Sequence, residues 1–87
     1  MKAIDELHLN GIKVFASEMT ADKNIADVDL KEPCAIVIGS EEKGIYPALM
    51  KICDEKIKIP MAGDFESFNV SVATGIILYE AMRQRKF

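Results

Sequence analysis

Hydrophobic and polar positions along this chain form short blocks that predict alternating strands and helices. Apolar residues recur with a helical spacing in some blocks, whereas others alternate or run unbroken in the way of strands. Gly, Pro and Asn separate the blocks and mark the turns between them. Helices are predicted over residues 3–9, 47–53 and 69–85, and strands over residues 12–17, 35–38 and 56–59.

The predicted strands differ in how they should lie in a sheet. The run 35–38 is apolar throughout, which is typical of a strand in the middle of a parallel sheet with helices on both faces. The strand 56–59 alternates, so Ile57 and Ile59 should point inward and the two lysines outward. This order of elements predicts an α/β fold with a mostly parallel sheet.

Two further segments carry a weaker pattern. Residues 18–33 are polar and predict an irregular connection, held to the core by Ile25, Val28 and Leu30. The last helix has an apolar stripe in which several residues recur at helical spacing. Its members are Val70, Ala73, Ile77 and Ala81, widened by Val72, Ile76 and Tyr79. Glu80 is interpreted as part of a solvated face.

Composition and charge narrow the classes of protein. The chain has 87 residues, of which 49% are hydrophobic and 29% charged, as expected of one small folded domain. The net charge of −3 argues against a free-standing nucleic-acid binder, but not against an RNA enzyme whose basic surface lies elsewhere. No run approaches the ~20 apolar residues that span a bilayer, and the N-terminus lacks a signal-peptide core. Cys34 and Cys53 are isolated and the chain has a single histidine, which argues against a zinc site. Two free thiols also suit a reducing cytoplasm.

A first candidate site lies at the end of the apolar strand, in the loop 39–44, GSEEKG. Open α/β sheets bind ligands at the carboxyl ends of their strands, and Gly39 would let the backbone approach a ligand closely. A plain turn with solvated charges is an equal alternative. A P-loop is excluded, because Ile45 and Tyr46 replace the Lys and Ser/Thr that would hold phosphate and magnesium.

A second candidate site follows the strand 56–59, where a Pro/Gly loop leads into the last helix. Ser67 and Asn69 stand at the helix start, where free backbone N–H groups favour a ligand, but helix capping alone would explain them. Met61 and Phe68 could form an apolar slot for a flat ring, although ordinary core packing is the simpler interpretation of Phe68.

A third candidate is the basic C-terminus with Arg83, Arg85 and Lys86. These positive charges would interact favourably with the negative end of the last helix, and a contact with RNA phosphate is the alternative. His8 stands alone on a terminal helix and is not expected to act as a base.

Taken together, the first two sites resemble motifs 2 and 3 of the SpoU/TrmH family of RNA ribose 2'-O-methyltransferases. The matching residues are 35–44, AIVIGSEEKG, and 57–73, IKIPMAGDFESFNVSVA. The chain is most similar to the C-terminal part of the bacterial 23S rRNA guanosine-2'-O-methyltransferases. The resemblance implies a trefoil knot near the C-terminus, a cytoplasmic homodimer, S-adenosylmethionine as cofactor, and 23S rRNA or tRNA as partner.

The resemblance also assigns roles to residues. It implies cofactor contacts by Gly39, Ile59, Met61 and Phe68, with Ile59 acting largely through its backbone. It implies that Glu41, Ser67 and Asn69 are the polar active-site residues, which order the substrate ribose and the methionine end of the cofactor.

Three departures from the family pattern bear on these roles. Glu42 stands where the family often has Gly, and Phe68 where it usually has Leu. The family's first motif, with an Asn and the catalytic Arg, has no match in the chain. Residues 1–87 therefore resemble the C-terminal portion of a catalytic domain, and we expect little activity from them alone. The alternative is a fragment that dimerises through its last helix, with Tyr79 and Met82 in contact, and binds no cofactor. A generic nucleotide-binding half-domain is a weaker alternative, since G-x-G-x-x-G is lacking.

Overall fold

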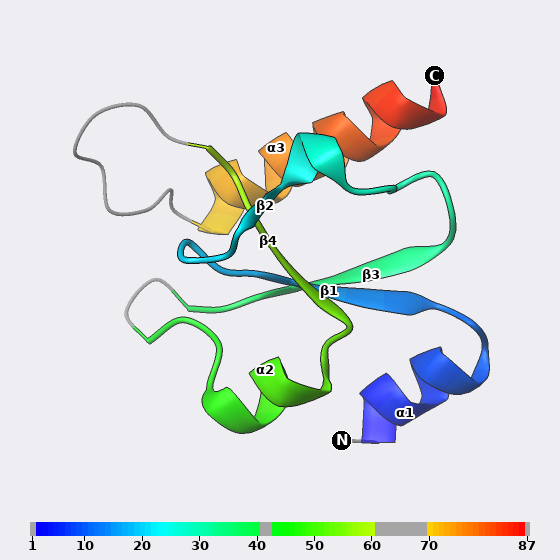
Figure 1. Cartoon of the computed structure of the whole chain (residues 1–87), viewed down its shortest axis with the longest axis vertical. Coiled ribbons are helices and arrows are strands. Elements are labelled where there is room, and N and C mark those ends of the chain that lie inside the picture. Colours follow the sequence, from blue (N-terminus) through cyan, green and yellow to red (C-terminus); the bar gives the residue numbers. More distant parts are fainter. Residues whose placement is uncertain (1, 41–42, 61–69, 87) are drawn as a thin grey trace.

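The fold is taken from a computed structural model of the chain that describes residues 2–40, 43–60 and 70–86. Helices and strands alternate along it (Figure 1). The elements are α1 (Lys2–Leu9), β1 (Lys13–Ser17), β2 (Lys23–Asn24), the 3₁₀ turn η1 (Ile25–Asp27), β3 (Cys34–Ile38), α2 (Pro47–Ile52), β4 (Glu55–Lys58) and α3 (Val70–Arg85). Every predicted helix and strand is confirmed, with its ends shifted by a residue or so.

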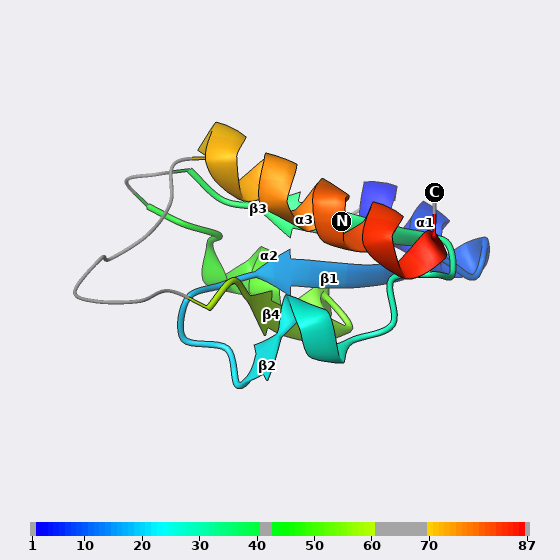
Figure 2. The same cartoon turned by 90° about the horizontal axis from the view of Figure 1, so that it is seen from above.

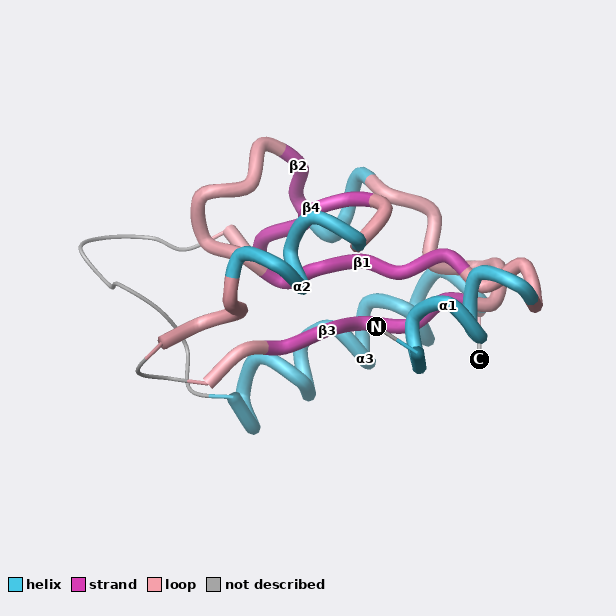
Figure 3. Tube along the Cα trace, turned by 90° about the horizontal axis from the view of Figure 1, so that it is seen from below, coloured by secondary structure: helices cyan, strands magenta, loops and turns pink. Residues whose placement is uncertain are grey.

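The described strands form one parallel four-stranded sheet in the order β2-β4-β1-β3. Helix α3 and η1 lie on one face, and α1 and α2 lie on the other (Figures 1 and 3). The view from above shows α3 running along the sheet on the side of β3 (Figure 2). The predicted α/β class with a parallel sheet is therefore confirmed. The predicted knot depends on residues 61–69, which lie outside the described residues.

The hydrophobic core lies between the sheet and α3. Phe15 of β1 and Ile57 of β4 are buried there against Ile77 of α3. Leu30, in the polar connection 18–33, is fully buried and packs in the same cluster. Ile25 and Val28 are buried beside it, so the prediction that these residues hold the 18–33 segment down is confirmed. The short β2 and η1 within that segment were not predicted, because two-residue strands leave no periodic signal.

The expected position of the strand 35–38 is wrong for the described sheet. β3 is an edge strand that pairs with β1 alone among the described strands, and all of its residues are half-buried. The interior strands are β1 and β4. Val14, Phe15 and Ala16 of β1 are buried on both faces. Apolar residues on both faces of a strand indicate that both faces are covered. They do not indicate whether a second strand pairs along its edge.

The predicted stripe on α3 is partly wrong. Ala73 and Ile77 are buried, but Val70, Val72 and Tyr79 are exposed, Tyr79 by 68%. The helix contacts the sheet along a narrower face than the pattern indicated. Glu80, interpreted as solvated, is only 8% exposed.

A polar network explains the burial of Glu80. Its carboxylate accepts bonds from Arg83 Nε at 2.8 Å and Nη2 at 2.7 Å, and from Gln84 Nε2 at 2.8 Å. These bonds, first the pair from Arg83 and then that from Gln84, lower the pKa of Glu80 to about 2. The amide of Gln84 also accepts from Leu30 N at 2.7 Å and donates to Val28 O at 3.0 Å. One glutamine thus fastens the polar connection to the last helix.

Candidate functional site

The two candidate loops leave the same edge of the sheet. Because all described strands are parallel, β3 and β4 both end at the same end of the sheet, at the left of Figure 1. The register of the strands shows how near the two strand ends lie. Ser17 of β1 pairs with Ile38 of β3 on one side and with Ile57 of β4 on the other. Gly39 and Lys58 therefore flank Glu18 at one level, with Ile59 one residue further along. The structure brings Gly39 and Ile59 to opposite sides of the end of β1.

The first loop folds back on itself. Gly44 N donates to Ser40 O at 2.9 Å, and Lys43 N donates to the Ser40 hydroxyl at 3.0 Å. Gly44 has a φ of +65°, a left-handed conformation that favours glycine. A Cβ on Gly39 would lie 2.1 Å from the carbonyl carbon of Gly44, so no side chain fits there. The closure of the loop itself therefore requires the glycine, without reference to a ligand.

Ser40 is a residue whose role was not singled out from the sequence. Its carbonyl and hydroxyl both accept bonds from the far side of the loop, so it sets the loop's shape. A serine that bonds to backbone N–H groups shortly after it is a common turn device, and this signal was available in the sequence.

The remaining predicted site residues are unevenly covered. Ile59 is half-buried, follows β4 directly and packs against the core cluster. The residues Glu41, Met61, Ser67, Phe68 and Asn69 lie outside the described residues. Of the predicted set, the structure thus places only Gly39 and Ile59.

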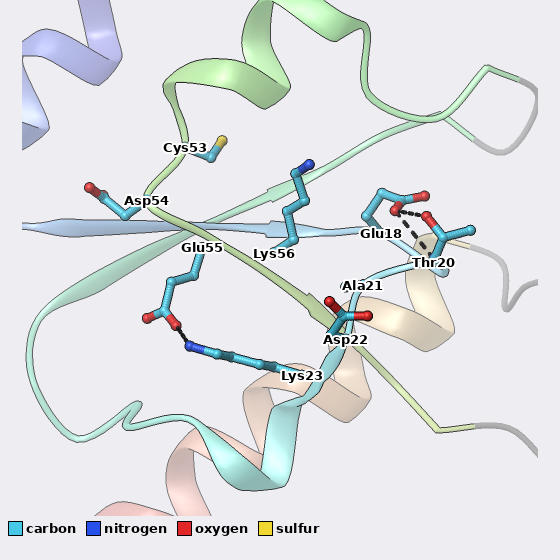
Figure 4. A pocket seen from close by; sticks show the side chains of 9 residues that line it. All are labelled: Glu18, Thr20, Ala21, Asp22, Lys23, Cys53, Asp54, Glu55 and Lys56. Carbon is cyan, nitrogen blue, oxygen red and sulfur yellow. Dashed lines mark hydrogen bonds and ion pairs between the residues drawn. The ribbon is translucent and has the colours of Figure 1, made fainter.

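A cavity of about 400 Å³ lies between the connection 18–23 and the start of β4 (Figure 4). Two of its carboxylates have partners within the lining: Glu55 pairs with Lys23, and Glu18 accepts bonds from the backbone and hydroxyl of Thr20. The ion pairs of Glu55 with Lys13 and Lys23 lower the pKa of its carboxyl. The cavity contains none of the predicted site residues.

At the amino end of the sheet, Asp54 joins three elements. Its Oδ2 accepts from Val14 N at 2.7 Å and lies 2.8 Å from His8 Nε2, while its own N–H donates to Val14 O at 2.7 Å. These bonds, chiefly that from Val14, lower the pKa of Asp54. His8 is thus tied to a structural carboxylate, at the end of the sheet away from the candidate loops.

The basic C-terminus is engaged within the chain. Arg83 pairs with Glu80, and Arg85 donates to Leu30 O at 3.0 Å and to Glu32 O at 3.1 Å. Lys86 has a φ of +59° and its N–H bonds to Arg83 O, as at a helix C-terminus. These contacts favour the structural interpretation of Arg83 and Arg85 over an RNA contact.

Within the described ranges, His, Cys, Asp and Glu form no group of three or more that could hold a metal ion. In the same part of the chain, no helix combines the length and apolar character needed to cross a membrane.

Comparison with known proteins identifies the family to which the chain belongs. The sequence profile described as the SpoU rRNA Methylase family matches residues 1–79. The chain belongs to that family. Among relatives of this SpoU family chain, a tRNA (guanosine(18)-2'-O)-methyltransferase from Aquifex aeolicus is 45% identical over 93% of this chain and 39% of its own length. A 23S rRNA (guanosine-2'-O-)-methyltransferase RlmB from Ralstonia nicotianae is 40% identical over 97% of this chain and 34% of its own length.

Solved structures agree with the family. The SpoU methyltransferase AviRb from Streptomyces viridochromogenes, in complex with the cofactor AdoMet, superimposes with a TM-score of 0.90 at 32% identity. That match covers 98% of this chain and 36% of the other. The A. aeolicus TrmH/SpoU tRNA modifying enzyme gives a TM-score of 0.87 at 43% identity, over 98% of this chain and 44% of the other. The SpoU family chain thus spans less than half of each of these four proteins. The family uses S-adenosylmethionine.

Proposed function

We propose that this chain is the cofactor-binding part of an S-adenosylmethionine-dependent enzyme that methylates a ribose 2'-hydroxyl of tRNA or 23S rRNA in the cytoplasm. The observation that carries the proposal is that β3 and β4 both end at the carboxyl end of the parallel sheet, where the two candidate loops begin, in a chain of the SpoU family. The A. aeolicus and R. nicotianae relatives named above are guanosine 2'-O-methyltransferases of tRNA and of 23S rRNA, and AviRb was solved with AdoMet.

The described residues fit such a cofactor. Gly39 has no room for a side chain beside the backbone of Gly44 and Ile45, so only its backbone can contact a cofactor. Ile59 is half-buried where β4 ends, so its backbone can meet a ring edge while its side chain stays in the core. Met61 and Phe68 complete the predicted apolar contacts, and Glu41, Ser67 and Asn69 are the predicted polar residues.

The chemistry divides between cofactor and chain. S-adenosylmethionine supplies a methyl group on a positively charged sulfur. The chain's task is positioning: Gly39 and Ile59 fix the cofactor, and Glu41, Ser67 and Asn69 orient the ribose so that its hydroxyl points at the methyl group. Holding two reactants in line removes much of the entropic barrier. Proton removal is assigned to no residue of this chain, and we therefore propose that the chain alone is inactive or very weakly active.

Calorimetric titration tests the binding half of this proposal. We expect heat of binding, and a raised melting temperature, when S-adenosylmethionine or its demethylated product is added. Gly39→Ala should abolish both, because its Cβ collides with the backbone of Gly44. Gly75→Ala is the matched control, since nothing lies within 4 Å of its Cβ position in α3. Absence of heat and of stabilisation at millimolar ligand would refute the proposal.

A methyl-transfer assay tests the catalytic half. Radiolabelled S-adenosylmethionine would be incubated with this chain and tRNA or 23S rRNA transcripts. Incorporation at background level is expected from the chain alone. Turnover at about 1 s⁻¹ or faster, ordinary for enzymes, would show that the chain holds a complete active site.

A second function, dimerisation through α3, is favoured by one observation. Leu78, Tyr79 and Met82 are exposed on that helix by 57%, 68% and 50%. Such an apolar surface is typical of an interface between copies. We expect light scattering to give a dimer and Tyr79→Lys to give a monomer with unchanged circular dichroism. Dimerisation without cofactor binding would favour the interaction fragment over the enzyme part.

A further inference from the structure

The strand β4 has two unlike faces, although it lies inside the described sheet between β2 and β1. Ile57 is fully buried in the core cluster beneath α3. Lys56 and Lys58 alternate with it and therefore lie on the opposite face, where Lys56 is exposed and Lys58 half-buried. On that same face of the sheet, the neighbouring strand β1 has the fully buried Val14 and Ala16. The described helices thus leave a charged face of β4 open to solvent, which we call the lysine face (Lys56 and Lys58).

The charges on the two faces of β4 are used differently. On the face toward α3, Glu55 forms ion pairs with Lys13 and Lys23. On the lysine face, neither ammonium group has an ion pair or a hydrogen bond among the described residues. Figure 4 shows Lys56 and Glu55 leaving β4 in opposite directions. Two positive charges therefore stand without a partner in the part of the chain that the structure describes.

The carboxylates near the lysine face are mostly engaged elsewhere. Glu18 and Asp54, which line the same cavity as Lys56, both accept hydrogen bonds from other groups of the chain. Asp22 lines this cavity too, and its carboxylate has no such partner within the described ranges. Asp22 is therefore the negative group that should most oppose an anion bound at Lys56.

We propose that the lysine face binds the phosphate backbone of the RNA substrate and guides it to the carboxyl end of the sheet. The inference rests on the proposed function, which makes RNA the substrate. Lys58 directly precedes Ile59, where the second candidate loop begins, so phosphates held along β4 would lie beside the candidate site. Side chains two residues apart on a strand are separated by ~6.6 Å. Two long lysine side chains at this spacing can contact neighbouring phosphates of one RNA strand.

The charge of the whole chain makes such a local contact necessary. Its net charge is −3, so RNA is repelled on average and needs a positive surface where it is to be held. Contacts of lysine with phosphate position a nucleic acid without reading its sequence. The lysine face would therefore hold RNA of any sequence, and selection of the target nucleotide would depend on other contacts.

The salt dependence of RNA binding tests the proposal. A fluorescently labelled tRNA transcript is titrated with the 87-residue chain, and its anisotropy is measured over a range of salt concentrations. Each phosphate contact contributes ~0.7–0.9 to the slope of log affinity against log salt concentration. The double variant Lys56→Gln with Lys58→Gln should therefore lower that slope by ~1.5 and weaken binding ~10-fold at low salt. Absence of RNA binding by the unaltered chain, or an unchanged slope in the variant, would overturn the inference.

Two further variants test the sign of the charge. Lys56→Arg with Lys58→Arg keeps both positive charges and should retain the affinity and the slope. Asp22→Asn removes the unpartnered carboxylate beside Lys56 and should tighten binding. A loss of affinity in the arginine variant equal to that of the glutamine variant would contradict a role in charge. Circular dichroism of each variant checks that the fold is kept.

Lys2→Gln with Lys31→Gln is the matched control. Both lysines are exposed and have no ion pair among the described residues, but they lie on α1 and in the connection before β3. The control should leave most of the affinity in place, and an equal loss would overturn the inference, because any lysine would then serve. Light scattering covers the other occupant: if the lysine variants change the association of copies and not RNA affinity, the lysine face is an interface between copies. Titration with S-adenosylmethionine, done without RNA, reports separately on the proposed function.

Discussion

The amide of Gln84 offers the sharpest test of how this small domain is held together. It is a side chain that bonds to the connection 25–30 and to Glu80 at once. Gln84→Ala removes the acceptor for Leu30 N–H and the donor to Val28 O. Leu30 is fully buried and Val28 is buried, and both bonds are part-buried, so water replaces them only in part.

The expected loss follows from the two orphaned groups. A buried donor or acceptor left without a partner costs ~1–3 kcal/mol. Two such groups give a loss of ~3 kcal/mol if each relaxes in part. The free energy of unfolding of a domain of this size is ~5–10 kcal/mol, so the loss is a large fraction of the total. It corresponds to a fall in melting temperature of ~12–24 °C.

Gln84→Glu separates the hydrogen bonds from the space the side chain fills. The new carboxylate can still accept from Leu30 N–H, but it cannot donate to Val28 O and faces the carboxylate of Glu80. Repulsion raises the pKa of the introduced acid in the folded state, so its penalty should shrink as pH falls from 7 toward 4. Glu80, with a pKa of about 2, stays ionised over that range.

The assay is urea denaturation at several pH values, with Ser71→Ala, an exposed change on the same helix, as control. We expect the control within ~0.5 kcal/mol of the parent chain. A loss below ~1 kcal/mol for Gln84→Ala, or a Gln84→Glu chain as stable as the parent at pH 7, would refute the assigned role of the glutamine.

Further predictions concern the sheet ends and the first loop. Asp54→Asn should lower the melting temperature at pH 7. The difference should narrow as pH falls below about 4, because the lowered pKa of Asp54 stabilises the fold only where the unfolded carboxyl is ionised; a difference that widened in acid would contradict this. Gly44→Ala should cost ~1 kcal/mol in denaturation experiments, since a left-handed φ is strained for a side chain even with open space around it. Gly44→Asn should cost less, and equal losses would show that another effect dominates.

The sequence predicted the elements well because its periodicity reports what lies above and below each segment. Ile57 alternates with lysines and is buried, and Ala73 and Ile77 recur at helical spacing and are buried. Strand order leaves no such signal. β3 looked central because both of its faces are covered, and only the hydrogen-bonded ladder shows it at the edge.

Long-range polar contacts were also beyond the sequence. Glu80 was interpreted as solvated because an isolated carboxylate is rarely buried. Its burial depends on Arg83 and Gln84 in the next turn and, through Gln84, on residues more than 50 positions away. The family resemblance pointed to a pair of loops as the candidate site, which stays a prediction, and it did not indicate that Gly39 is required by its own loop.

The strand order has a consequence for any ligand held by both loops. β1 lies between β3 and β4, and parallel strands are ~4.8 Å apart, so Gly39 and Ile59 are separated by ~10 Å across the sheet edge. A ligand that contacts both must cross the end of β1 at Ser17 and Glu18. The carboxylate of Glu18 accepts bonds from Thr20, and the Glu18 N–H donates to Ile57 O, so both groups are already engaged at the crossing point. An extended molecule with a polar group at each end suits this arrangement better than a compact one.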